Sequence, residues 1–511
     1  MKKNIIFVII LILILVSLGI GLSYSMWNMS LSQETNNVIA TTNDCFDIAI
    51  TSQENAIKLE NACPISDTKG KTLTPFTFTI KNTCDMAASY SVSLESLKES
   101  TLSSEFLKVM VNDNDPMILN TLDITDTVNS GSVESRVLDT GTIFKNKTKE
   151  YSIRLWIDYD TTMEDLNNET KVLKSRIIIK GVPSDEEEPL ELLTDHITTL
   201  STTDTTNIAT DDPDNNIRYI GANPDNYIYF NCSDYSNQTA DTCEKWRIIG
   251  VFNNATKSDG TQENLIKILR NEDIGKYSWD TSSSDISEGK GVNDWSQADL
   301  MKLLNPGYES ESVGGSLYYS SKSGTCYNDK ENSITSCDFT STGLKNDATR
   351  NAIESVVWNL GGANSYSSPS NGLASHWYGY ERGTAVYSGR PTTWTGKIGL
   401  MYPSDYGYAT AGGSTTNRTS CLAKDLLGWD SSSYTDCKNN DYLFKSSYAQ
   451  WTLTSNSGFA HYVFRVYTLG DVAGNYAYLT RGVHPALFLK SSFKIKNGDG
   501  SENSPYELNI E

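Results

Sequence analysis

The chain has 511 residues, of which 38% are hydrophobic, 28 are Tyr and 10 are Trp. This is the composition of a globular protein, and at about 150 residues per domain it predicts two to four domains. The formal net charge of -21 argues against nucleic acid as a partner, because binding a polyanion requires clustered positive charge. The four histidines are His196, His376, His461 and His484. They lack the spacing of metal ligands, so we expect neither a metal site nor a cofactor.

The N-terminus carries an export signal. Lys2 and Lys3 precede an uncharged run over residues 5–22, and Ser25 offers a small residue for cleavage. A basic start, an apolar stretch and small residues are typical of a secretory signal peptide, but the run is also about long enough to cross a bilayer. Positive charge before the run keeps the N-terminus inside the cell. Residues 1–25 are therefore expected to be a signal peptide or a membrane anchor, with the rest of the chain extracellular.

The nine cysteines fit an oxidising, extracellular setting. Six of them form close pairs around short polar loops, and none has the CxxC spacing of a zinc or redox site. The predicted disulfides are Cys232–Cys243, Cys326–Cys337 and Cys421–Cys437. In the first group of three, Cys45 begins one expected strand and Cys84 follows another, whereas Cys63 lies in a turn. A Cys45–Cys84 bridge would pin two neighbouring strands, so we expect that pairing.

Residues 38–184 predict an all-β domain. Short alternating runs, separated by Asn, Asp, Ser and Gly turns and almost free of helical periodicity, are typical of a β-sandwich. The expected strands lie within residues 45–51, 56–60, 75–82, 89–95, 106–112, 150–157 and 174–181. Residues 185–216 follow as a linker. They begin with an acidic Asp-Glu-Glu-Glu-Pro run and continue rich in Thr and Asp, a composition that favours an extended chain.

Together with the leader, the first part of the chain resembles the camelysin/TasA-like exported proteins of Gram-positive bacteria. The resemblance rests on Thr42–Ile48, Pro64–Gly70 and Phe76–Cys84, and it covers roughly residues 1–185. It implies a β-sandwich protein of the cell surface or of an extracellular matrix. Some members have been assigned metalloprotease activity, which we do not expect here because the chain has no HExxH or comparable zinc-ligand spacing.

Residues 217–511 predict an α+β domain. Strand-like runs lie at residues 227–231, 246–251 and 265–270, and a Ser258-Asp259-Gly260 turn suggests that the last two form a hairpin. Amphipathic helices are expected over residues 293–304 and 346–360, each followed by glycine. Residues 363–452 have little periodicity and predict long loops. A β-meander over residues 448–490 and a tight turn at residues 497–501, rather than a calcium loop, complete the expected fold.

This order of elements resembles the C-type-lectin-like fold of bacterial and phage display proteins and of formylglycine-enzyme-like domains. The resemblance rests on Trp246–Val251, Trp451–Thr454 and Gly482–Leu489, and it covers about residues 217–492. In that family the penultimate strand and loop carry the ligand surface. The resemblance thereby implies ligand contacts at Ser455, Asn456, His461, Tyr462, Arg465, Tyr467, Tyr476, Tyr478 and Arg481.

The composition of this last meander also suits a contact surface, because Tyr, Trp, Arg, Asn and Ser combine large area with hydrogen bonding. The alternative is a meander whose aromatic side chains pack an ordinary core. We therefore expect an exported cell-surface protein, anchored or secreted, whose last domain binds an extracellular protein or glycan without catalysis. The sequence leaves two alternatives open. One is a matrix or fibre subunit that self-assembles through the sandwich, and the other is an extracellular enzyme using His461 and His484.

Overall fold

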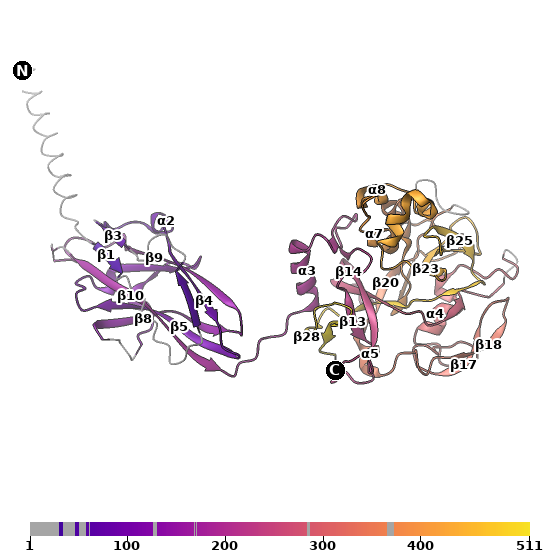
Figure 1. The fold of residues 1–511 in the computed structure, drawn as a ribbon, viewed down its shortest axis with the longest axis horizontal. Helices are drawn as coiled ribbons and strands as arrows, with labels where there is room; N and C mark the ends of the chain where they lie inside the picture. Colours follow the sequence, from indigo (N-terminus) through magenta and orange to yellow (C-terminus); the bar gives the residue numbers. More distant parts are fainter. Residues whose placement is uncertain are drawn as a thin grey trace, which may run out of the picture. The chain divides into compact units, whose positions relative to one another are not determined.

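The computed structural model describes residues 30–33, 46–50, 58–60, 62–125, 130–167, 169, 171–283, 287–364 and 372–510. The chain divides into two compact units, Met1–Pro189 and Leu190–Glu511 (Figure 1). It is rich in β-structure, with 37% of residues in strands and 16% in helices, which agrees with the β-rich fold that the sequence predicts. None of the helices in the described ranges is both long and apolar enough to span a membrane. The predicted signal or anchor, residues 1–25, lies outside these ranges.

The first unit contains two five-stranded sheets. The first sheet has the order β3 (Lys58–Glu60), β1 (Ser30–Gln33), β10 (Val172–Ser184), β5 (Ala87–Leu97) and β8 (Ser132–Ile143). The second has the order β2 (Phe46–Ile50), β4 (Phe76–Asn82), β9 (Thr148–Ile157), β6 (Leu107–Val111) and β7 (Met117–Ile118). A single turn of helix, α2 (Asp67–Gly70), precedes β4.

Alternating apolar residues on these strands form one core between the two sheets. Along β4, Phe76, Phe78 and Ile80 point inward, and Phe78 stacks on Tyr151 of β9 with ring centroids 5.0 Å apart. Val92 on β5 belongs to the same buried cluster. Because side chains alternate along a strand, each sheet presents one apolar face, and the two faces bury each other. This part of the structure agrees with the sandwich that the sequence predicts.

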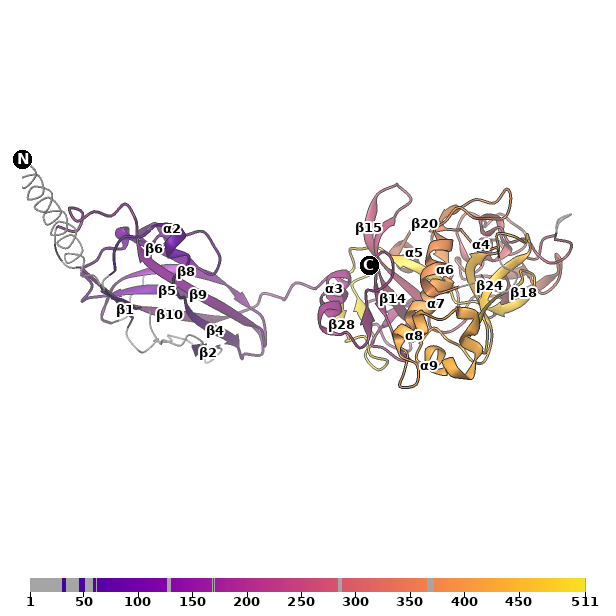
Figure 2. The same cartoon turned by 90° about the horizontal axis from the view of Figure 1, so that it is seen from above.

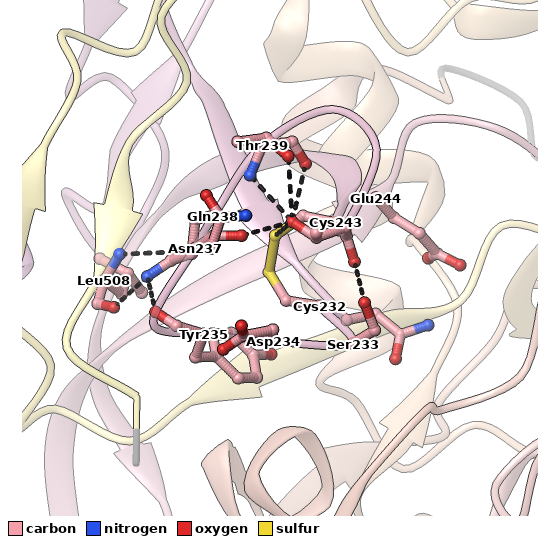
Figure 3. Close-up of a disulfide and its surroundings, with 12 residues drawn as sticks. Cys232, Ser233, Asp234, Tyr235, Asn237, Gln238, Thr239, Cys243, Glu244 and Leu508 are labelled. Carbon is pink, nitrogen blue, oxygen red and sulfur yellow. Dashed lines mark hydrogen bonds between the residues drawn. A yellow bond between two sulfur atoms is a disulfide. The ribbon is translucent and has the colours of Figure 1, made fainter.

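The three disulfides predicted for the second unit are confirmed. The loop closed by Cys232–Cys243 also holds the end of the chain, as Figure 3 shows. The Gln238 side chain donates to the carbonyl oxygen of Leu508 at 2.6 Å and accepts from its backbone amide at 3.1 Å. In the first unit Cys84 is disulfide-bonded, and its predicted partner, Cys45, lies outside the described residues.

Much of the predicted linker over residues 185–216 folds with the second unit instead. Helix α3 (Leu193–Thr203) and strand β11 (Ile208–Ala209) lie within it. Leu193 and Ile197 are fully buried against the core of the second unit. These two apolar residues are four apart and so lie on one face of a helix, a pattern that the surrounding Thr and Asp residues conceal.

The main sheet of the second unit has eight strands. Its order is β11, β12 (Ile217–Tyr219), β14 (Glu244–Thr256), β15 (Gln262–Arg270), β27 (Ala486–Leu489) and β19 (Ile353–Glu354). Strand β13 (Tyr227–Phe230) pairs with β14, and β22 (Ile398–Gly399) pairs with β27. The predicted hairpin between β14 and β15 is confirmed, and Gly260 in its turn has the positive φ of +84° that glycine adopts readily.

A five-stranded sheet carries the terminal meander, in the order β16 (Lys276–Ser278), β26 (Thr480–Gly482), β23 (Gln450–Ser455), β24 (Tyr462–Val466) and β25 (Val472–Tyr476). Three two-stranded sheets complete the unit. They pair β17 (Ser323–Tyr327) with β18 (Ile334–Asp338), β20 (Val356–Asn359) with β21 (Thr393–Gly396), and β28 (Ile495–Asn497) with β29 (Glu507–Leu508).

The first expected helix, over residues 293–304, is present as a 3₁₀ turn, Trp295–Gln297, followed by α4 (Asp299–Leu304). The second, over residues 346–360, is wrong beyond its first half. Helix α5 (Asp347–Ala352) ends before Ile353, which pairs with Leu489 of β27. The β-branched side chains of Ile353, Val356 and Val357 favour strands, and pairing in the sheet outweighs the helical spacing.

The loops expected over residues 363–452 also contain four short helices. These are α6 (Ala374–Glu381), α7 (Pro403–Ala409), α8 (Arg418–Leu422) and α9 (Thr435–Asn439). Helices α6 and α7 pack side by side (Figure 2), and Cys421–Cys437 joins α8 to α9. Helices of five to eight residues show at most two turns, too few for a sequence periodicity to emerge.

Candidate ligand-binding surface

The terminal meander brings most of the predicted contact residues together. Strands β24 and β25 are antiparallel neighbours, and Tyr462 lies directly opposite Tyr476. Side chains at opposite positions share one face of a sheet and contact each other. The loop before β24 adds Phe459 and His461, and the segment after β25 adds Tyr478. We call these five residues the aromatic strip.

The rings of the aromatic strip form a continuous series. The centroids of Tyr462 and Tyr476 are 4.8 Å apart, those of His461 and Tyr476 are 5.5 Å apart, and those of Tyr476 and Tyr478 are 5.9 Å apart. Phe459 adds an edge contact to Tyr462 at 5.7 Å. The planes of the first three pairs differ by 27–30°, so these rings pack mainly face to face. Such contacts hold the rings in place before any ligand arrives.

Four of the five rings of the aromatic strip reach solvent. Phe459 is 40% exposed, His461, Tyr476 and Tyr478 are half-buried, and only Tyr462 is buried, at 4%. The Lys290 ammonium lies 5.5 Å from the ring of Tyr476. Burial, and secondarily the charge of Lys290, lowers the pKa of His461, which keeps its ring neutral near pH 7. The strip is therefore an uncharged aromatic surface with one cation beside it.

A second group on the same sheet combines arginine with an exposed ring. The Arg465 guanidinium lies 4.2 Å from the ring centroid of Tyr467, and its Nη1 lies 3.7 Å from Asp471 Oδ2. Arg481 donates from Nη1 to its neighbour's carbonyl, Thr480 O, at 2.7 Å. Burial lowers the pKa of both arginines, which stay charged at neutral pH because a free guanidinium titrates far above it. Nε and Nη1 of Arg465 and Nε of Arg481 are buried, and Tyr467 is the exposed ring of this group.

Three of the nine predicted contact residues lie in the interior. Ser455, Asn456 and Tyr462 are buried, so their side chains shape the surface instead of forming it. Asn456 Oδ1 accepts from the backbone amides of Gly458 and Phe459 at 2.8 and 3.0 Å, which closes the turn that presents Phe459. Asn and Ser are as common in such turns as in contact surfaces, so residue type alone does not distinguish a turn residue from a contact residue.

Asn293 is a positioning residue that the sequence did not indicate. Its buried Nδ2 lies 2.8–3.0 Å from three carbonyl oxygens, those of Asn456, Phe459 and Tyr462. One amide thereby fixes both ends of the loop that carries the aromatic strip. Its position beside the predicted helix over residues 293–304 suggested only a helix start.

Replacing Asn293 with Ala is expected to lower the free energy of unfolding of the second unit by about 1–3 kcal/mol, because the three carbonyls lose their shared donor. Urea denaturation followed by tryptophan fluorescence measures this. Asn509 Oδ1 accepts one bond from Lys494 N near the chain end, and Asn509→Ala serves as a control with a smaller expected loss. An Asn293 variant as stable as the parent would contradict the role.

A buried ionic cluster lies elsewhere in the second unit. Asp405 on α7 forms ion pairs with two cations. Lys267 Nζ of β15 lies 2.5 Å from its Oδ2, and Arg218 Nη1 of β12 lies 2.9 Å from its Oδ1. Arg218 Nε also lies 2.6 Å from Asp212 Oδ2. All four side chains are buried. Two cations against two carboxylates balance the charge, which buried ions require. The rings around the Lys267 ammonium belong to Tyr402, Trp358, Phe252 and Phe488, at 4.4–5.8 Å.

Glu381 on α6 is buried beside this cluster. Ser404 donates to its carboxyl group through both backbone amide and hydroxyl. Burial raises the pKa of Glu381 to about 7, although the nearby Arg382 opposes the shift. The two cations of the cluster are already matched by Asp212 and Asp405, so the cation left to Glu381 is Arg382, whose Nη1 lies 3.4 Å from Glu381 Oε2.

Neither a family model nor a curated protein matches the chain. Functional assignment therefore rests on the side-chain geometry of the second unit. In the described part of the chain, no group of three or more His, Cys, Asp or Glu residues is placed to hold a metal ion.

The two histidines considered for acid–base catalysis occupy different surroundings. His484 is buried, with Nδ1 2.9 Å from Arg270 O and Nε2 3.0 Å from the Tyr448 hydroxyl. Burial lowers the pKa of His484 to about 4. His461, in contrast, contacts the rings of the aromatic strip. His484 thus behaves as a neutral structural residue, and the geometry provides no shared site for the pair.

Proposed function

We propose that the chain is an exported cell-surface protein whose second unit, with a C-type-lectin-like fold, binds an extracellular ligand without catalysis. The observation that carries this proposal is the aromatic strip, in which five rings are held in mutual contact and four of them reach solvent. Soluble proteins rarely leave contiguous aromatic surface exposed unless a partner covers it. The three disulfides of this unit are consistent with an extracellular setting.

The packing of the rings favours a protein over a glycan as the ligand. Tyr476 is stacked on His461 and on Tyr478, so the faces that a sugar ring would cover are largely taken. The hydroxyls of Tyr476 and Tyr478 form no hydrogen bond with any residue that the structure describes, and they remain free to bind a partner's backbone or side chains. Tyrosines that offer edges and hydroxyls are typical of protein contact surfaces.

The attachment of the protein to the cell is a separate part of the proposal. Residues 1–25 would either be removed on export or remain as a membrane anchor, and in both cases both units lie outside the cell. Mass spectrometry of the protein recovered from its native membrane and culture medium distinguishes these outcomes, because cleavage after Ser25 gives a new N-terminus.

The test of binding uses the exported chain, residues 26–511, with its disulfides oxidised. It is screened against arrays of extracellular proteins and of glycans, with and without calcium. For a ligand that binds saturably, the Tyr476→Ala/Tyr478→Ala variant is expected to have an affinity lower by about tenfold or more, since interface tyrosines often contribute more than 1.4 kcal/mol each. Titration calorimetry measures the dissociation constant.

The matched control removes two tyrosines outside the strip, Tyr159 of the first unit and Tyr387, and should leave affinity unchanged. Both double variants must keep the parent's melting transition. A ligand bound equally by the strip variant and the parent would contradict the site. A ligand found on the glycan array alone would move the assignment from protein to glycan recognition.

A further inference from the structure

An open pocket of about 490 Å³ lies in the second unit, away from the residues of the aromatic strip. Strands β13 and β14 form one side through Tyr227 and Arg247. The end of α9 and the segment before β23 form the other through Lys438, Asp441 and Lys445. We call this the cationic pocket, because three basic side chains line it in a chain whose net charge is -21.

Arg247 is a buried cation without an acidic partner. It is 4% exposed, and its guanidinium lies between the rings of Tyr227 and Tyr442, 3.7 and 4.9 Å from their centroids. Its hydrogen bonds go only to neutral oxygens, those of Asn226, Asn223 and Pro224. No carboxylate forms an ion pair with it among the residues that the structure describes. Buried charges are almost always paired, so this one calls for a counter-ion.

Lys445, which also lines the pocket, is a second cation without an acidic partner in the described part of the chain. Its side chain is half-buried, and within the described ranges it forms neither an ion pair nor a hydrogen bond. Burial lowers the pKa of Lys445, and the charges of Glu272 and Asp273 oppose that shift. Lys438 completes the basic set, although its ammonium already donates to Leu469 O. Among the described residues, none of the three cations therefore forms an ion pair with a carboxylate.

The carboxyl group in the pocket does not supply the missing charge. Asp441 is 4% exposed, and its Oδ1 accepts from the Leu443 amide at 2.9 Å. Its Oδ2 is buried and has no hydrogen-bond partner in the described part of the chain. Burial raises the pKa of Asp441 well above its usual range, which favours the protonated form of the carboxyl group, a hydrogen-bond donor.

We propose that the cationic pocket binds the oxyanion of a small acidic ligand, a carboxylate or a phosphate group attached to a body that packs on Tyr442 and Phe444. Arg247 and Lys445 supply the opposing charge, and the Asp441 hydroxyl supplies a further donor. The volume of about 490 Å³ exceeds what an oxyanion alone requires, which is why the ligand includes an organic body such as a sugar. This site is independent of the aromatic strip.

The first experiment titrates the oxidised chain, residues 26–511, with inorganic phosphate, glucose 6-phosphate, glucuronate and neutral glucose by calorimetry. Saturable binding of at least one anionic probe, weakened by added salt, is expected, with no binding of glucose. Stronger binding of glucose 6-phosphate than of glucuronate identifies phosphate as the preferred group, and the reverse identifies carboxylate. Absence of binding by all three anions, or equal binding of glucose, would overturn the proposal.

Two variants then test the residues. Lys445→Met should lower the affinity for the anion by about tenfold, the effect of one charge-assisted hydrogen bond. Lys330→Met, at an exposed site, should leave that affinity unchanged. Asp441→Asn keeps a donor at the same position and should change affinity by no more than about threefold. An ionised Asp441 would repel the anion, so a gain of about tenfold or more in Asp441→Asn would contradict the assigned donor. Unchanged affinity in Lys445→Met would overturn the site.

Discussion

Replacing Asp405 with Asn is expected to lower the free energy of unfolding of the second unit by about 3–5 kcal/mol. Asp405 accepts from Lys267, Arg218 and the Tyr402 amide, at 2.5, 2.9 and 2.9 Å, within the core. Asparagine keeps the shape but removes the charge. The Lys267 ammonium, fully buried among aromatic rings, would then lack a counter-ion, and an uncompensated buried charge is far more costly than a lost surface contact.

The size of this effect separates Asp405 from acids on the surface. Asp347 also pairs with an arginine, Arg350 at 2.9 Å, but it is 91% exposed, so Asp347→Asn should cost less than about 1 kcal/mol. Lys267→Met should cost less than Asp405→Asn, because Asp405 keeps Arg218 as its partner. Urea denaturation of the oxidised protein orders the three variants. A loss below about 1 kcal/mol in Asp405→Asn would show that the cluster does not stabilise the fold as its geometry implies.

This cluster also marks the limit of what the sequence predicts. Alternation of apolar residues was sufficient to place strands such as β4 and β15, because that signal is local. Lys267 and Asp405 are 138 positions apart, and nothing near either residue indicates that they meet. Strand β8, in contrast, was not predicted from the sequence. Its pairing with β5 contains two register irregularities, which interrupt the alternation that would have revealed it.

The terminal meander was predicted in outline but not in detail. The sequence predicted a β-meander over residues 448–490, within which Tyr462 and Tyr476 face each other across β24 and β25. It did not separate residues that shape the surface, such as Asn456, from those that form it, because a buried turn and a contact loop use the same side chains. Phe459 and Asn293 were missed for a related reason, since their roles depend on how one loop folds back on the sheet.

The cationic pocket shows the same dependence on tertiary structure. A net charge of -21 argues against a polyanion as partner, but it is a sum over the chain and conceals local excess. Arg247 looks like an ordinary strand residue in the sequence. Only the folded chain shows that Lys438 and Lys445, nearly 200 positions later, line the same hollow, and that burial raises the pKa of the carboxyl group of Asp441 in it.

Replacing Glu381 with Gln is expected to stabilise the second unit at pH 8 by roughly 3 kcal/mol and to have almost no effect at pH 4.5. Burial raises the pKa of Glu381 from 4.5 to about 7, and each unit of such a shift corresponds to about 1.4 kcal/mol. Between these two values the folded chain holds a proton that the unfolded chain has lost. The contribution of Glu381 to the free energy of unfolding therefore falls as pH rises from about 4.5 to 7 and is level above 7.

Glutamine stays neutral at every pH, so the stability gain of the variant over the parent should grow across this window. Asp280 and His484 have shifted pKa values too, near 6 and 4, but they titrate in both proteins and cancel in the difference. Denaturation at pH 4.5, 6 and 8 measures the gain, with the exposed Glu187→Gln as a control that should show none. A gain independent of pH, or a loss of stability at pH 8, would mean that Glu381 is ionised and paired in the folded protein, with Arg382 as its counter-ion.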